Sequence, residues 1–315
     1  MLMLFTKRLL LVLATLLLAS AVVFGLLSVV PGDPAKTMLG VTATPQAVAD
    51  LRHELGLDRS VTTRYFSWLG GLFHGDFGQS YVTRRSVGPD VMSHLQVSLI
   101  LVIAAMLVAL IVAIPSGTYA AYRSRHVDGA LVGLTSQLGI AIPGFLAGLL
   151  LVVVFAVKLR WLPASGWAAP IDGAGPFLSH LVLPALALGL VQGAILSRYM
   201  RSAVLDVMHE DYMRTARAKG LSPLQTLLRH GMRNAAISVL TISAIELAAL
   251  LVGAIVIENV FVIPGLGTLL VRSVENRDMV SVQAIVMVIV VAVLAINLLV
   301  ELLYLLIDPR LRSER

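Results

Sequence analysis

Apolar residues are gathered into long runs along this chain, and shorter polar segments separate the runs. A helix needs about 20 apolar residues to cross the hydrocarbon core of a bilayer, and most of the runs reach that length. One shorter run contains Pro184, which a spanning helix tolerates where its neighbours satisfy the freed carbonyl group. The runs cover residues 9–30, 95–121, 131–157, 178–196, 237–257 and 281–306. The pattern predicts an all-α, polytopic membrane protein with six transmembrane helices.

The first run could also be the apolar core of a signal peptide, because Lys7 and Arg8 precede it. The core of a signal peptide is only about 7–15 residues long, and a cleavage site with small residues follows it. The run 9–30 is longer, and residues 30–34 offer no such site. We therefore expect a retained first span.

The composition agrees with a membrane protein. Hydrophobic residues make up 58% of the chain and charged residues 13%, whereas soluble domains carry about 25% charged residues. The sequence contains no cysteine, which excludes disulfides, thiol catalysis and thiolate metal sites.

Basic residues are concentrated in the segments that would lie on the same side of the membrane as the N-terminus. Arg123 and Arg125 occupy a short loop on that side, and Arg214, Arg217 and Lys219 lie in a longer one. By the positive-inside rule, this side is the cytoplasm. We expect both termini in the cytoplasm. The same rule accounts for the net charge of +6, so we expect no nucleic-acid partner.

The spans divide the chain into three predicted parts. Residues 1–93 would hold the first span and an extracytoplasmic excursion, in which Thr44 and Pro45 begin a helix. Residues 94–307 would form a core of the remaining spans, and residues 308–315 a cytoplasmic tail. The longest cytoplasmic loop within the core is 197–235.

The polar segment 210–234 predicts two short helices joined at Gly220. Glycine commonly follows the end of a helix, because it adopts a left-handed conformation without steric cost. Ser222 then suits the N-cap position, Pro223 the first helical position, and Gln225 completes a capping box. The second helix would continue into the span 237–257.

Two polar residues within the spans are candidates for a translocation path, Gln192 and Glu246. An acidic group at the centre of a spanning helix costs about 2.5–3.5 kcal/mol on insertion scales, so it should face protein or water. Glu246 either attracts a cationic end of a substrate or forms a structural hydrogen bond to another helix. Gln192 is more typical of a hydrogen bond between helices.

The connection 258–280 is apolar yet contains Pro264, Gly265 and Gly267. It is too short to span the membrane and return. A dipping loop, or a short helix lining the outer mouth, fits this pattern, since irregular backbone at that depth needs protein or water around it. Glu258 and Phe261 belong to the same outer-mouth segment.

The motifs of the common enzyme classes are absent. The sequence has no Walker A loop, no His-Glu-x-x-His and no Gly-x-Ser-x-Gly. We expect no catalytic residue, cofactor or metal site on this chain, and therefore no enzyme.

The polar segment resembles the cytoplasmic loop of ABC-importer permeases, often written E-A-A-x-x-x-G. Gly220 and Ala216 match that motif, whereas Arg214 and Thr215 replace its Glu and first Ala. The longer string is similar to the dipeptide, oligopeptide and nickel branch of the family. It comprises Asp211, Tyr212, Arg214, Thr215, Ala216, Arg217, Ala218, Lys219, Gly220, Leu221 and Ser222. Similar matches occur in order at 31–34, 55–58, 75–80, 257–261, 264–267 and 308–310; Ser238 departs from a frequent proline.

The resemblance implies the type I permease fold of an ATP-driven importer in the bacterial cytoplasmic membrane. It implies that this loop docks on an ATPase subunit, and that ATP and Mg²⁺ bind to the partner ATPases. The implied partners are a second homologous permease, two ATPase subunits and an extracytoplasmic solute-binding protein. The implied substrates are di- or oligopeptides, with a nickel chelate as the alternative. An ion-driven secondary transporter is the alternative from another class, which would show paired broken helices and acidic partners within the membrane.

Overall fold

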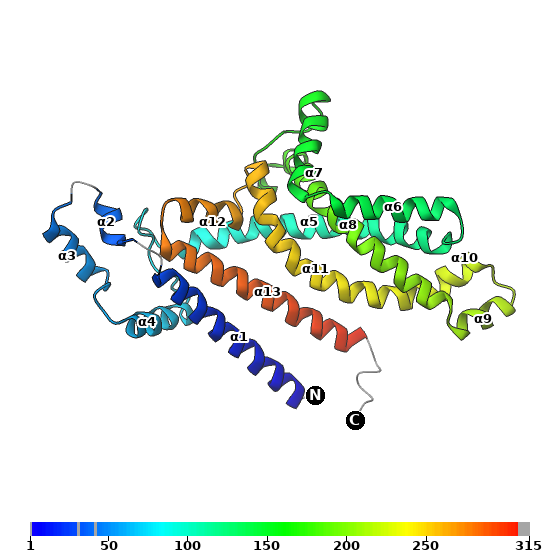
Figure 1. Ribbon diagram of the computed structural model, residues 1–315, viewed down its shortest axis with the longest axis horizontal. Helices are drawn as coiled ribbons and strands as arrows, with labels where there is room; N and C mark the ends of the chain where they lie inside the picture. The colour runs from blue at the N-terminus through cyan, green and yellow to red at the C-terminus, as the bar shows by residue number, and fades with distance from the viewer. Residues whose placement is uncertain (1, 30–31, 41–42, 308–315) are drawn as a thin grey trace. The chain divides into compact units, whose positions relative to one another are not determined.

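The computed structural model describes residues 2–29, 32–40 and 43–307, and these residues are almost entirely helical (Figure 1). They fall into two compact units. Unit 1 comprises residues 1–97 and 265–294, and unit 2 comprises residues 98–264 and 295–315. The two long helices α5 (Val87–Tyr122) and α13 (Met279–Ile307) run from one unit into the other.

Unit 1 contains the first span and the polar excursion. Its helices are α1 (Leu2–Val29), α2 (Pro34–Leu39), α3 (Pro45–Glu54), α4 (Val61–Phe73), α12 (Leu266–Glu275), the start of α5 and most of α13. Asp33, Thr44 and Ser60 cap α2, α3 and α4, because each side chain accepts a hydrogen bond from a backbone N–H of the first turn. The predicted helix start at Thr44 and Pro45 is therefore confirmed.

A buried carboxylate holds the excursion to the start of α13. Asp278 is 5% exposed. It accepts hydrogen bonds from the Ser80 hydroxyl at 2.5 Å, the Tyr81 backbone N–H at 3.1 Å and the Ser281 hydroxyl at 2.7 Å. The segment around Ser80 is thereby fixed against α13 by a fully hydrogen-bonded charge.

Unit 2 is built around α8. Its elements are the rest of α5, α6 (Val127–Ala141), α7 (Gly144–Leu151), the π-helix η1 (Val152–Lys158), the 3-10 turn η2 (Pro170–Asp172), α8 (Ala174–Met208), α9 (Asp211–Ala218), α10 (Pro223–Thr226), the π-helix η3 (Leu227–Gly231) and α11 (Met232–Phe261). Helix α8 packs against α6, α7 and α11, and many of its residues are buried.

Helices α5 and α8 approach each other through small residues. A Cβ placed on Gly189 would lie 2.6 Å from the carbonyl oxygen of Ala105, and one on Gly117 would lie 2.5 Å from that of Ser197. Those distances are too short for any side chain, so glycine is required at both positions. Such contacts are typical of helix packing in membranes, where small residues let backbones come close.

The predicted spans are present as long apolar helices, with one change in shape. The described residues contain 5 helices suited to crossing a membrane, or up to 6 if a bent pair counts as one span. The bent pair joins α6 to α7 and η1 at an angle of 100°, so the predicted span over 131–157 consists of two helices with a bend between them. Proline pushes the residue before it towards an extended backbone, and Ile142 before Pro143 has a ψ of 120°.

Candidate functional site

The polar segment after α8 forms the predicted helix-turn-helix. Helix α9 begins at Asp211 and ends at Ala218, and Gly220 follows with a φ of 94°. A side chain at Gly220 would meet no atom within 4 Å. Glycine is therefore favoured here by its backbone conformation alone, not by lack of space.

The start of the second helix has the predicted capping box. The Ser222 hydroxyl accepts from the Gln225 backbone N–H at 3.3 Å, and the Gln225 side-chain oxygen accepts from the Ser222 N–H at 3.2 Å. Pro223 occupies the first turn of α10. These contacts fix the point at which the chain leaves the turn and re-enters a helix.

Helix α10 continues without a break into the next span. Residues Pro223–Phe261 form one helical segment of 39 residues, as the sequence predicted. The sequence did not indicate the π-helical turn η3 within it. Gly231 closes this turn, and a Cβ there would lie 2.8 Å from a side-chain carbon of Leu227.

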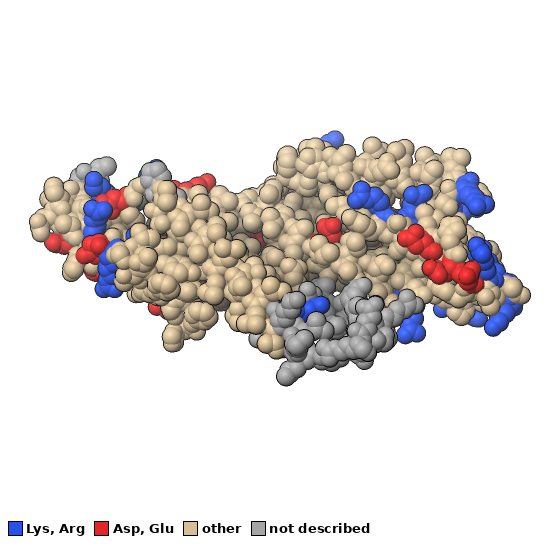
Figure 2. All heavy atoms as spheres, turned by 60° about the horizontal axis from the view of Figure 1, so that its bottom comes forward, with Lys and Arg blue, Asp and Glu red and all other residues tan. Residues whose placement is uncertain are grey.

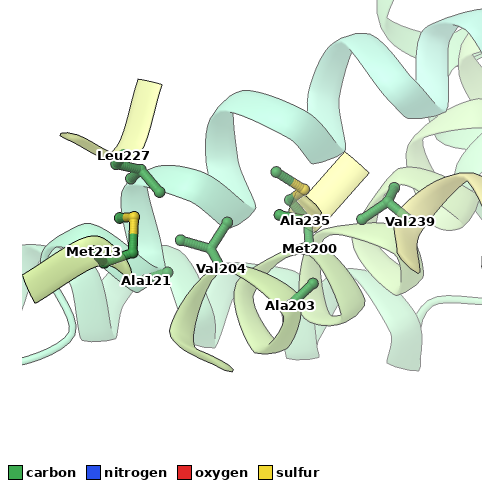
Figure 3. Packing of buried hydrophobic residues seen from close by; sticks show 8 residues of the cluster. All are labelled: Ala121, Met200, Ala203, Val204, Met213, Leu227, Ala235 and Val239. Carbon is green, nitrogen blue, oxygen red and sulfur yellow. The ribbon is translucent and has the colours of Figure 1, made fainter. Parts of the chain in front are cut away.

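A hydrophobic cluster anchors the helix-turn-helix to the bundle (Figure 3). Met213 of α9 and Leu227 of η3 are 2% and 0% exposed. They pack with residues from the ends of α5 and α8 and the start of α11. The other members of the cluster are Ala121, Met200, Ala203, Val204, Ala235 and Val239. Helix α9 and the π-helical turn η3 therefore share one core with three long helices.

Two polar contacts brace α9 against its neighbours. The Asn234 amide donates to the Tyr212 hydroxyl at 2.8 Å, which links α9 to α11. The Arg217 guanidinium donates to the carbonyl oxygens of Met208 and Met213, each at 3.3 Å. Met208 is the last residue of α8, so Arg217 satisfies a carbonyl that the helix end leaves unpaired.

The opposite face of the helix-turn-helix is exposed and charged. Exposed residues of the matched segment include Asp211, Tyr212, Arg214, Thr215, Arg217, Ala218, Lys219, Gly220 and Ser222, whereas Ala216 is buried and Leu221 half-buried. Figure 2 shows Lys and Arg side chains, with a smaller group of acidic ones, at the end of unit 2 that carries α9 and α10. The ion pair between Arg214 and Asp211 is exposed and long, at 3.4 Å, and adds little stability.

The two candidate path residues lie in contact. The Gln192 amide on α8 donates a hydrogen bond of 2.7 Å to the Glu246 carboxylate on α11. Gln192 is 7% exposed, and Glu246 is half-buried. The sequence offered no partner for Glu246, because the two residues are far apart in the chain.

Three serine hydroxyls join α5, α6 and α8 at another point. Ser197 is 2% exposed, and its oxygen lies 2.9 Å from that of Ser116 and 3.2 Å from that of Ser136. No sequence signal singled out these serines, since isolated serines are ordinary within spanning helices. Among the described residues, no group of three His, Asp or Glu side chains could hold a metal ion.

The predicted outer-mouth segment contains a short helix. Helix α11 ends at Phe261, Val262 is left-handed with a φ of 53°, and α12 begins after Pro264 and Gly265, with Gly267 buried in its first turn. Glu258 is 1% exposed and accepts a hydrogen bond of 2.5 Å from Ser98. The carbonyl of Phe261 accepts from the backbone N–H of Gly166 at 2.8 Å.

Two family models match the chain. The model described as binding-protein-dependent transport system inner membrane component matches residues 113–313, and the model of the N-terminal part of such membrane components matches residues 1–102. Together they cover the helix-turn-helix, the polar pair and the excursion.

Similar proteins are permeases. The chain is 38% identical over 307 residues to the probable peptide ABC transporter permease protein y4tP of Sinorhizobium fredii, covering 97% of this chain and 98% of that protein. It is 40% identical over 309 residues to the glutathione transport system permease protein GsiC of Escherichia coli K12, covering 98% of both.

A solved structure supports the fold. An amino acid ABC transporter crystallised with histidines matches with a TM-score of 0.50 at 14% identity, covering 69% of this chain and 93% of that chain. At that identity the likeness concerns the fold alone.

Proposed function

Because this chain belongs to the family of binding-protein-dependent transport system inner membrane components, we propose that its loop 197–235 couples it to a separate ATPase. The chain is a multi-pass permease subunit of the inner membrane with the fold of an ABC-importer permease. In the proposed coupling, closure of the ATPase pushes on α9 and α10, and the motion passes into the spans.

The observation that carries this proposal is the continuity of α10 with α11. A force applied to α10 acts on one helical segment, Pro223–Phe261, which reaches through the membrane. Helix α9 cannot move separately at low cost, because Met213 is buried in the same cluster as Leu227. Moving either helix alone would expose apolar area at about 25 cal/mol per Å².

The proposed docking face is the exposed side of residues 211–222. Arg214 and Lys219 offer charge to a partner, and Tyr212 offers an aromatic edge. Arg217 has a different role in this proposal, because its contacts to the end of α8 hold α9 in place. The partner ATPases would bind ATP and Mg²⁺.

The assembly we propose contains this permease, a second homologous permease, two ATPase subunits and an extracytoplasmic solute-binding protein. Both termini lie in the cytoplasm, with 1–93 as first span and excursion, 94–307 as permease core and 308–315 as tail. The tail lies outside the described residues.

The proposed substrates are di- or oligopeptides, since relatives include permeases named for peptide and glutathione transport. A nickel chelate is the second candidate, from the resemblance of the loop.

The Gln192–Glu246 pair marks our proposed polar point on the path. The carboxylate would attract the amino terminus of a peptide, while the amide holds the carboxylate in position between α8 and α11. Residues 258–267 would line the outer mouth.

Substitution of Gly220 by valine tests the coupling. A β-branched residue strains a backbone with a φ of 94°, so the turn should shift and transport should uncouple. In proteoliposomes containing the whole transporter, we expect ATP hydrolysis to persist while uptake of a peptide falls by an order of magnitude or more.

The matched control is Gly133→Val, because Gly133 also has open space around it but lies within α6. This variant should retain coupled uptake. If Gly220→Val transports peptide as well as the wild type, with normal ATP hydrolysis, the coupling assignment is wrong.

A further inference from the structure

Unit 1 contains a partly open cavity of about 540 Å³ that the transport proposal does not use. It is bounded by the end of α1, by α3 and α4, by the segment around Gly78 and by the start of α13. Phe24, Leu27 and Trp68 form an apolar part of its wall. The cavity is therefore amphipathic, with an apolar part and a charged part.

Four arginines line the charged part: Arg52, Arg59, Arg64 and Arg277. Arg52 pairs with Asp33 at 3.5 Å. In the described part of the chain, Arg59, Arg64 and Arg277 form no ion pair. Guanidinium groups gathered without a carboxylate partner are suited to an oxyanion, which they bind by paired N–H donors.

The acidic residues of the lining do not cancel this charge. Asp33 caps α2 and pairs with Arg52. Asp76 accepts a hydrogen bond of 2.9 Å from the backbone N–H of Gly78. Glu54 is exposed at the end of α3. The lining of the cavity thus contains more basic than acidic side chains, and two of the acidic ones already accept hydrogen bonds or form an ion pair within the chain.

The cavity lies at the level where α1 leaves the membrane. The apolar span of α1 ends at Val29, and Phe24, Leu27 and Ser28 in its last turns line the cavity. Tryptophan and arginine at this level are typical of the boundary between lipid tails and headgroups. The position favours a ligand of the membrane over a soluble one.

A second cavity, of about 390 Å³ and almost wholly apolar, follows the same face of α1 deeper in the span. Leu13, Leu17 and Ser20 line it from α1. Leu13, Ser20 and Leu27 follow one another at intervals of seven residues, and so do Leu17 and Phe24. Because residues seven apart lie on the same side of an α-helix, both cavities lie along one stripe of α1. Leu72 and Met287 complete the apolar wall from α4 and α13.

We propose that unit 1 binds one anionic phospholipid. Its phosphate lies among Arg59, Arg64 and Arg277, and an acyl chain lies along the α1 stripe. The apolar cavity at membrane depth favours a lipid over the carboxylate of a soluble peptide, which would leave that cavity unfilled.

Native mass spectrometry of the whole transporter, delipidated and titrated with lipid, tests the proposal. Both lipids carry the phosphate, but the arginines also repel the quaternary ammonium of phosphatidylcholine. We therefore expect the wild type to bind phosphatidylglycerol about tenfold or more tightly than phosphatidylcholine. The double variant Arg64→Gln/Arg277→Gln should lose this preference.

The matched control is Arg84→Gln/Arg272→Gln, which removes the same charge from exposed positions of unit 1 outside the cavity. It should bind like the wild type. Equal loss in the control would show attraction by net charge only and overturn the site. If the cavity variant fails to assemble, the wild type alone decides, because equal affinity for both lipids also overturns it.

Competition identifies the source of the oxyanion. Glycerol phosphate or a dipeptide, each at millimolar concentration, should leave bound phosphatidylglycerol in place. Displacement by glycerol phosphate would show a site for soluble phosphate, and displacement by the dipeptide a substrate site. Either result overturns the lipid proposal.

Discussion

Glu246 shows how one contact changes the interpretation of a residue. Alone in an apolar helix, an acid is either functional or costly. In the structure, one carboxylate oxygen of Glu246 accepts a hydrogen bond of 2.7 Å from the Gln192 amide. The other carboxylate oxygen does not take part in that hydrogen bond. The pair is therefore able to serve both as a link between α8 and α11 and as a polar point for a substrate.

Replacement of Glu246 by glutamine separates these two roles. Glutamine keeps the size and an acceptor oxygen for Gln192, so assembly and melting temperature should stay near those of the wild type. Uptake of peptides with a free amino terminus should fall severalfold, because the negative charge is lost. Uptake assays in proteoliposomes measure transport, and co-purification of the partners measures assembly. Unchanged uptake kinetics would show that Glu246 does not lie on the path.

Asp278 has a structural role at the same scale. In Asp278→Asn, the amide group can accept with only one oxygen, so at least one of the donors from Ser80, Tyr81 and Ser281 loses its acceptor. We expect a loss of about 2–3 kcal/mol, the cost typical of an unsatisfied buried group. Thermal unfolding of the purified chain measures it. Ser281→Ala, which removes one donor only, should cost about 1 kcal/mol, and equal effects would contradict this account.

At the scale of elements, the helix-turn-helix depends on shared burial. Helix α9 has only 8 residues and would not be stable alone. Met213 and Leu227 place α9 and η3 in a common core with α5, α8 and α11. The caps at Ser222 and Gln225 fix where the second helix begins, and packing fixes which face it exposes.

Adjacent leucines test this dependence on packing. Leu227 is 0% exposed and Leu228 is 58% exposed. Leu227→Ala should destabilise the loop by about 2–5 kcal/mol, as cavities in packed cores do, and trypsin should cleave faster after Lys219. Leu228→Ala should leave cleavage of the isolated chain unchanged. Limited proteolysis with both variants decides, and similar rates for the two would show that the cluster does not hold the loop.

At the scale of the whole molecule, the order of spans determines which loops share a side of the membrane. The family assignment removes the ion-driven transporter as an alternative, because the chain belongs to a binding-protein-dependent system. The proposed placement of the termini in the cytoplasm rests on the distribution of Lys and Arg and the positive-inside rule.

The absence of cysteine from the sequence makes this topology easy to measure. A single cysteine at Ser222 should react with a membrane-impermeant thiol reagent only after the cells are permeabilised. A cysteine at Thr62 should react in intact cells whose outer barrier admits the reagent. Both side chains are exposed, so burial does not confuse the result. The reverse pattern would invert the proposed orientation.

Local chemistry made the helix-turn-helix predictable. Gly220, Ser222, Pro223 and Gln225 act on their immediate neighbours, and each took the predicted position. The spans were predictable for a similar reason, since length and hydropathy suffice. The bend at Pro143 was not predicted, because the prediction of a span over 131–157 rested on length and hydropathy, which do not register a proline's effect on the residue before it.

Contacts between distant residues were not predictable. The bond from Gln192 to Glu246 and the serine contacts of Ser197 depend on how helices are rotated against each other. That rotation is set by close approaches such as the one at Gly189, which no single stretch of sequence reveals. The burial of Asp278 was not predictable from the sequence for the same reason.

The π-helical turn η3 has a consequence for comparing relatives. A π-helical turn contains an additional residue relative to an α-helical one, and each residue turns a helix by about 100°. Residues 223–226 are therefore rotated from where an uninterrupted α-helix leading into α11 would place them. A relative with a one-residue deletion in 227–231 would present a different set of side chains on its cytoplasmic face, and such a gap in an alignment marks a change of partner surface.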